Sequence, residues 1–128
     1  SKLADKLVQG GYAKDGYVKA ITEREKEFPT GINSIVPFAL PHVDYSFSLK
    51  EGLAIAVLAK NVAFGQMGSS EEKISVRIIL MPVLLPGGSL GKVLTHLLES
   101  MKNIKFLRKL MSSKSPSEVK KLFIEELS

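Results

Sequence analysis

His42 is the residue whose type and position most favour a role in catalysis or binding. It follows Pro41, which holds Leu40 extended and ends any strand at that point, so the imidazole is expected at a strand terminus that faces a loop. Sites in α/β proteins concentrate in such places. Two interpretations stay open for the isolated residue: a functional imidazole, or a structural one that bonds a backbone carbonyl.

Arg24 and Asp44 are the candidate partners of His42. Arg24 lies upstream in the charged run 23–27, where the simplest interpretation is a solvated charge at a helix end. If the chain folds back through residues 29–32, however, the guanidinium reaches an anion held at His42. Asp44 could complete a base dyad with His42, but no placed nucleophile accompanies the two.

Several other kinds of site are excluded by residues that the chain lacks. There is no cysteine, which excludes disulfides, thiolate metal sites and cysteine nucleophiles, and two histidines are too few for a structural zinc site. The segment 86–93 resembles a phosphate-binding loop, but Pro86 and Val93 stand where that motif needs Gly and Ser or Thr. No Gly-x-Ser-x-Gly motif of a serine hydrolase occurs. We therefore expect neither a metal nor another cofactor.

The composition predicts one globular domain over residues 1–128. With 45% hydrophobic and 24% charged residues, the chain can bury a core. The net charge of +5 is concentrated at the C-terminal end, where residues 101–128 hold seven basic and three acidic side chains. These alternate with apolar residues at helical spacing, which favours a solvated helix face over a nucleic-acid interface. The longest apolar run has eight residues and contains Pro82, so it predicts a buried strand rather than a membrane helix, and we expect a cytoplasmic protein.

Periodicity and breakers predict an α/β or α+β fold with a mixed sheet of four or five strands and helices on both faces. Two helices come first: residues 3–8, closed by Gly10-Gly11, and a helix capped by Asp15 that ends at Pro29. The strands are expected at 36–40, 53–59, 62–64 (a short edge strand) and 74–83 (the central strand), with a Gly/Ser loop through residue 70. Three helices follow, with caps at Ser89, Asn103 and Ser115.

Three short motifs occur in order between residues 23 and 42: Arg-Glu at 24–25, Thr-Gly-Ile at 30–32 and Pro-His at 41–42. In this order and spacing they resemble the active-site region of enzyme IIA domains of the fructose/mannitol type. These belong to the phosphoenolpyruvate-dependent sugar phosphotransferase system (PTS). The form Glu-Phe-Pro-Thr-Gly-Ile at 27–32 is most similar to the galactitol-specific branch. A looser similarity in the order of helices and strands extends over nearly the whole chain and implies the type 2 PTS IIA fold.

The resemblance implies a role for each matching residue. His42 would accept a phosphoryl group from the phosphocarrier HPr and pass it to a cysteine of the IIB component, which must lie on another chain or domain because this chain has no cysteine. Arg24 would neutralise phosphate charge. Thr30 and Gly31 would shape the loop, and the Thr30 hydroxyl could bond phosphate or imidazole. The domain itself would stay outside the membrane and work with a IIC permease.

Two departures from the family pattern are visible. Mannitol-type members often carry a second active-site histidine on the helix after the central strand, and the apolar pattern places that position at Leu90. His96 lies six residues further on and is turned about 240° around the helix, so it is expected to be structural or on the surface. Members also usually have a strand before the first helix, so we expect this chain to lack some native N-terminal residues.

Three other functions remain as alternatives. The first is a IIA-like regulatory domain, in which phosphorylation of the histidine controls a transcription regulator or another partner. The second is a small hydrolase that uses His42 and Asp44, which the missing nucleophile argues against. The third is a basic nucleic-acid binder, for which binding would depend strongly on salt.

Overall fold

A long antiparallel hairpin forms the centre of the fold in the computed structural model, which describes residues 2–128. Its strands are β3 (Gly52–Gln66) and β4 (Ser69–Val83), paired from Gly52 with Val83 to Gln66 with Ser69. The predicted strands 53–59 and 62–64 are therefore one continuous strand, and the predicted Gly/Ser loop is a tight turn at Gly68, whose φ is 80°. The polar residues 60 and 61 suggested a break between two strands. They lie instead in an exposed part of β3 where the pairing with β4 is irregular, and such a part of a strand accommodates polar side chains.

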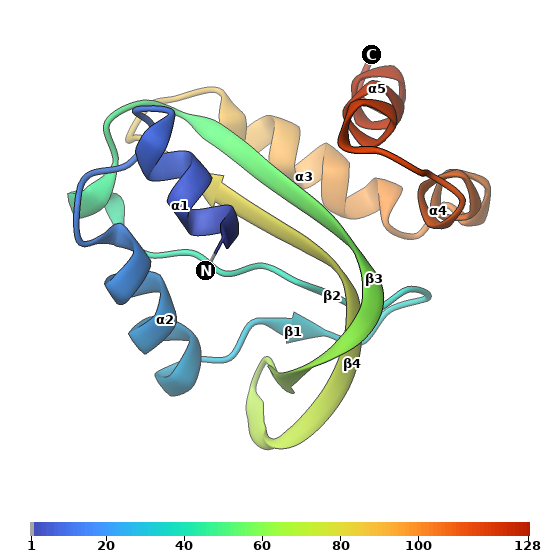
Figure 1. Ribbon diagram of the computed structural model, residues 1–128, viewed down its shortest axis with the longest axis horizontal. Helices are drawn as coiled ribbons and strands as arrows, with labels where there is room; N and C mark the ends of the chain where they lie inside the picture. The colour runs from blue at the N-terminus through green and yellow to red at the C-terminus, as the bar shows by residue number, and fades with distance from the viewer. Residues whose placement is uncertain (1) are drawn as a thin grey trace.

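Two very short strands complete the mixed sheet. β1 (Gly31–Ile32) pairs antiparallel with β2 (Phe38–Ala39), and β2 pairs parallel with β4 through Phe38 and Ile78. The hairpin curls so that Gly31 also pairs with Gln66 near the far end of β3, which closes the four strands into a ring in the order β1-β2-β4-β3. The segment that leads to His42 is thereby attached to the central hairpin (Figure 1).

Helices cover both faces of the hairpin, as predicted. Figure 1 shows α1 (Lys2–Gln9) and α2 (Tyr17–Glu27) on one side, and α3 (Leu90–Ser100), α4 (Ile104–Met111) and α5 (Pro116–Glu126) on the other. Side chains of β4 alternate between the two layers. Ile78 and Leu80 are buried against the C-terminal helices, whereas Met81 and Val83 are buried against α1 and α2. The mixed sheet between two helical layers confirms the predicted fold class.

Two of the four predicted helix caps form the hydrogen bonds expected of them. Asn103 accepts from the backbone N–H groups of Lys105 (3.1 Å) and Phe106 (3.3 Å), and Ser115 accepts from Glu118 (3.2 Å). The predicted cap at Asp15 is wrong, because Gly16 (φ 93°) precedes α2 and no side chain of residues 2–128 caps that helix.

The start of α3 is capped from elsewhere in the chain. Ser89 occupies the predicted cap position, but its side chain makes no capping bond. Glu51, at the start of the hairpin, accepts instead from the N–H groups of Leu90 (3.1 Å) and Leu85 (3.2 Å). A carboxylate at a helix N-terminus also opposes the positive end of the helix dipole, so it replaces the local serine. Local sequence contains no signal for such a tertiary cap.

Tyr17 is buried beneath α1 with an unpaired hydroxyl. The side chain is 1% exposed, and its Oη has no hydrogen-bond partner among the described residues. We expect Tyr17→Phe to raise the free energy of unfolding by about 1 kcal/mol, because it removes an unsatisfied polar group and keeps the ring. Urea denaturation at neutral pH measures the change. A loss of stability would show that the hydroxyl has a favourable partner.

The same substitution has a pH signature. Burial raises the pKa of Tyr17 from 10.0 to about 12. Between those values the unfolded chain releases the proton before the folded chain does, so stability falls as the pH rises through this window. Below pH 10 the hydroxyl is protonated in both states, so the ionisation of Tyr17 takes nothing from the stability of the fold. The phenylalanine variant therefore loses less stability than the unmodified protein between pH 10 and about 12.

Candidate active site

The loop after β2 presents His42 at the surface with one ring nitrogen already bonded. Nδ1 lies 2.6 Å from the carbonyl oxygen of Leu40, and Pro41 between them is buried. A carbonyl only accepts, so Nδ1 carries the hydrogen and donates. In the neutral ring Nε2 is then unprotonated, and within residues 2–128 it has no protein partner. The exposed imidazole thus offers one free lone pair.

His42 lies in a cavity of about 380 Å³ that four parts of the chain form together. The lining residues come from α2, the loop after β2, the end of β4 with the residue that follows it, and α3: Arg24, Leu40, His42, Val43, Asp44, Tyr45, Pro82, Leu84 and Leu94. The chain folds back through residues 29–32, as the sequence required for Arg24 to approach His42. Both residues line the same cavity.

Arg24 is exposed at the C-terminal end of α2 and is oriented by an aromatic ring. Its guanidinium carbon lies 4.2 Å from the centre of the Phe28 ring, a cation–π geometry that fixes a long side chain at low cost in rotamer freedom. The pKa of Asp44 is lowered, mainly by hydrogen bonds from Ser46 and further by the charge of Arg24. The positive field of Arg24 therefore reaches the loop that carries His42.

Asp44 does not form a base dyad with His42. Its carboxylate accepts from the backbone N–H of Ser46 (2.9 Å) and from the Ser46 hydroxyl, and so caps the short helix η1 (Tyr45–Phe47). The donor nitrogen of His42 bonds the Leu40 carbonyl instead. Each group that a dyad would join is bonded elsewhere, and this geometry argues against the hydrolase alternative.

Glu25 and Thr30 anchor the loop to α2. The backbone N–H of Thr30 donates to Glu25 Oε2 (2.8 Å), and the Thr30 hydroxyl donates to Oε1 (2.7 Å). Thr30 is 3% exposed, and its Oγ1 also accepts from the N–H of Leu40 (3.2 Å). The Leu40 carbonyl in turn accepts from His42. A continuous series of hydrogen bonds therefore runs from Glu25 on α2 through Thr30 and Leu40 to the imidazole. The Thr30 hydroxyl bonds Glu25 and Leu40; within residues 2–128 it does not bond the imidazole, and a bond to phosphate stays a prediction.

The role of Glu25 was missed in the sequence. It stands in a charged run that is typical of a solvated helix end. Two signals were available: Glu25 belongs to the Arg-Glu motif at 24–25, and the helix ends before Pro29, so the chain must turn back and bring the Thr30 N–H past the last helical turn. A carboxylate at that place satisfies a buried backbone donor.

Gly31 is required by close approach to β3. A Cβ atom there would lie 2.6 Å from the carbonyl oxygen of Gly65, far inside contact distance. The Gly31 carbonyl accepts from the N–H of Met67 (2.8 Å), which joins the loop to the end of β3. Thr30 and Gly31 together thus fix the loop from two sides, in line with the shaping role expected for them.

The other predicted positions lie outside the cavity. His96 is exposed on α3 and does not line the cavity, as expected for a surface residue. Leu90, where a second histidine was considered, is half-buried and donates its N–H to Glu51. The residue of α3 that lines the cavity is Leu94, one helical turn further on.

Two global observations concern residues 2–128. No group of three or more His, Asp or Glu side chains is arranged to hold a metal ion. None of the helices combines the length and the apolar character needed to cross a bilayer.

Comparisons with known proteins give the family. The family described as "Phosphoenolpyruvate-dependent sugar phosphotransferase system, EIIA 2" matches residues 1–126. The crystal structure of IIA mannitol from Escherichia coli is similar at 25% identity and a TM-score of 0.72, over 95% of this chain and 84% of that one. The Escherichia coli complex of the mannitol enzyme IIA with phosphorylated enzyme IIB is similar at 24% identity and a TM-score of 0.75, over 97% and 83%. No curated protein matches. The chain belongs to the EIIA type 2 family of the PTS, and is a phosphoryl-carrying component of that system.

Proposed function

We propose that His42 is the phosphoryl acceptor and that Nε2 is its reacting nitrogen. The observation that carries the proposal is the bond from Nδ1 to the Leu40 carbonyl, which leaves Nε2 unprotonated in a cavity shared with Arg24. An unprotonated nitrogen attacks phosphorus without first losing a proton. The Nε2–P bond forms as the bond from phosphorus to the donor breaks. The ring gains positive charge in this step, and the Leu40 carbonyl dipole stabilises it.

A phosphorylated imidazole suits a carrier. Imidazole is a good leaving group, so the phosphoramidate keeps a high transfer potential, whereas a serine ester would trap the group. In the second step a thiolate forms the S–P bond and the Nε2–P bond breaks. Positioning and neutralisation of charge on the phosphoryl oxygens supply the catalysis, and Arg24 is the side chain for the latter.

We propose HPr as the donor and a cysteine of a IIB component as the recipient. One of the similar structures is a complex of enzyme IIA with phosphorylated enzyme IIB, which supports a IIB partner for this chain. The absence of cysteine places the recipient thiol on another chain or domain. Sugar uptake would then proceed through a IIC permease, with this domain acting on the cytoplasmic side.

We further propose the galactitol-type branch. The form Glu-Phe-Pro-Thr-Gly-Ile at residues 27–32 is the first support. The second is the part of the cavity wall that α3 contributes. Its lining residue is Leu94, and α3 places no histidine in the cavity beside His42. A single-histidine mechanism follows from that arrangement.

The test measures both steps of the relay, phosphoryl transfer to this domain from HPr and then from this domain to IIB. Incubation with phosphoenolpyruvate, enzyme I and HPr should add one phosphoryl group, seen by intact mass, that brief acid treatment removes as expected of a phosphoramidate. Added IIB should then take the group. No gain while HPr itself is phosphorylated would contradict the proposal, and an acid-stable group would indicate an ester. Acceptance without transfer to any IIB would favour the regulatory alternative.

Arg24→Ala should slow acceptance by roughly 100-fold, the usual cost of removing one charge-stabilising donor from a transfer site. The acceptor itself remains, so the final extent of phosphorylation is unchanged. Rapid-quench measurement of the rate from phosphorylated HPr checks this. Lys19→Ala is the matched control, because Lys19 is an exposed cation on the same helix outside the cavity. An equal rate in both variants would reduce Arg24 to a surface charge.

A further inference from the structure

A second cavity lies behind the loop that carries His42. It has a volume of about 400 Å³ and shares no lining residue with the His42 cavity. In two extended segments the linings alternate: residues 40 and 42 line the first cavity and residue 41 the second, and residues 82 and 84 line the first and residues 79 and 81 the second. Alternation of this kind places the two cavities on opposite faces of the same chain segments.

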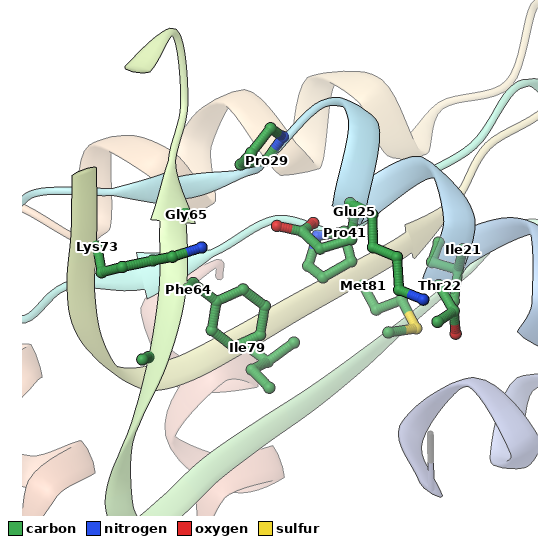
Figure 2. Close-up of a pocket in the computed structure, with 12 residues that line it drawn as sticks. Ile21, Thr22, Glu25, Pro29, Pro41, Phe64, Gly65, Lys73, Ile79 and Met81 are labelled. Atoms are coloured by element: carbon green, nitrogen blue, oxygen red, sulfur yellow. The ribbon is translucent and has the colours of Figure 1, made fainter. Parts of the chain in front are cut away.

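The second cavity has an apolar interior of ligand-binding size. Pockets for small molecules typically span about 300–1,000 Å³ and are lined mainly by hydrophobic side chains. Most lining residues here are apolar: Ile21, Pro29, Pro41, Ala63, Phe64, Ile79 and Met81. Figure 2 shows Phe64, Ile79, Met81 and Pro41 around one common space. This interior suits an apolar body.

The polar groups of the second cavity leave a positive charge unpaired. Both oxygens of Glu25 accept from Thr30, and the Thr22 hydroxyl donates to the Val18 carbonyl (2.8 Å). Lys26 and Lys73 also line the cavity, and within residues 2–128 neither forms an ion pair. Figure 2 shows the Lys73 side chain extended across β3 at Gly65. The two ammonium groups and the Glu25 carboxylate give the lining a net charge of +1, which favours an anionic head group beside the apolar interior.

We propose that this second cavity binds a small amphipathic anion, such as an aryl sulfonate or an alkyl carboxylate. The apolar body lies against Phe64, Ile79 and Met81, and the head group lies between Lys26 and Lys73. A free sugar does not suit the site, because its hydroxyls would face an apolar lining with few free partners. The proposal is independent of the role of His42.

The test uses 8-anilinonaphthalene-1-sulfonate, whose fluorescence rises in apolar surroundings. Titration of the folded protein should saturate at one site, and decanoate should displace the probe. The double variant Lys26→Gln/Lys73→Gln should weaken binding about tenfold, the usual effect of losing two partly exposed charge contacts. Ala63→Phe places a ring in the cavity from an exposed strand position and should abolish binding. Circular dichroism checks that both variants are folded.

The matched control is Lys60→Gln/Lys109→Gln, which lowers the net charge equally at exposed positions outside the cavity. Binding that survives Ala63→Phe, or that falls equally in the two lysine pairs, would overturn the proposal. So would self-association of the unmodified protein that Ala63→Phe blocks, because a second copy would then occupy the cavity.

Discussion

His42→Ala should abolish phosphoryl acceptance and leave the fold intact. The variant removes the nitrogen that forms the bond to phosphorus, and no other side chain lining the cavity is a comparable nucleophile. The exposed imidazole makes one hydrogen bond, to the Leu40 carbonyl, which solvent can replace. We expect a stability change within about 1 kcal/mol. Intact mass after incubation with phosphoenolpyruvate, enzyme I and HPr measures acceptance.

His96→Ala is the matched control for this experiment. It removes the only other histidine, which is exposed on α3 outside the cavity, and should accept a full phosphoryl group. Full acceptance by the His42 variant, or loss of acceptance in the His96 variant alone, would overturn the assignment. Thermal denaturation of both variants separates a lost acceptor from a lost fold.

Glu25→Ala should both destabilise the protein and slow phosphoryl transfer. The substitution leaves the buried N–H and hydroxyl of Thr30 without their acceptor, which we expect to cost about 2–3 kcal/mol of unfolding free energy. Thr30 then holds Leu40 less firmly, through its backbone carbonyl (3.3 Å) without a fixed hydroxyl, and the Leu40 carbonyl is what selects the tautomer of His42. Part of the neutral population shifts its hydrogen to Nε2, which removes the nucleophile. We expect at least a roughly tenfold lower rate.

Measuring the tautomer of His42 separates an effect of Glu25 on the orientation of the imidazole from a simple loss of stability. Nitrogen NMR of His42 should report hydrogen on Nδ1 in the unmodified protein and a mixture of tautomers in Glu25→Ala. Glu25→Gln retains one acceptor oxygen and should recover part of the rate. Glu27→Ala, an exposed carboxylate at the same helix end, is the control. An unchanged tautomer and rate in folded Glu25→Ala would show that these hydrogen bonds do not position the acceptor.

Much of the fold could be predicted because its signals are local. Helical periodicity, Asn103 and Ser115 placed the C-terminal helices, since a cap acts within one turn of its own sequence. The site was predictable in part for a similar reason: Pro41 ends the strand, and Pro29 ends the helix that carries Arg24. Two chain reversals of known position bring Arg24 and His42 to one cavity.

The features that could not be predicted depend on contacts between distant segments. Glu51 caps α3 from the start of the hairpin, and nothing near Ser89 indicates it. β1 and β2 have two residues each, too few for a period of two to be recognised. Glu25 looks solvated because burial of its partner Thr30 arises only after the loop folds. In each case tertiary structure supplied the partner.

The ring of strands separates the assembly of the site from the assembly of the core. The β3–β4 hairpin joins neighbouring residues through one tight turn, and hairpins of this kind form within about 1–10 μs. β2 must instead find β4 across a large stretch of chain, pairing Phe38 with Ile78, which makes its docking a slow, non-local event. We therefore expect the loop that carries His42 to reach its final structure after the hairpin has formed, so the core is in place before the site is complete.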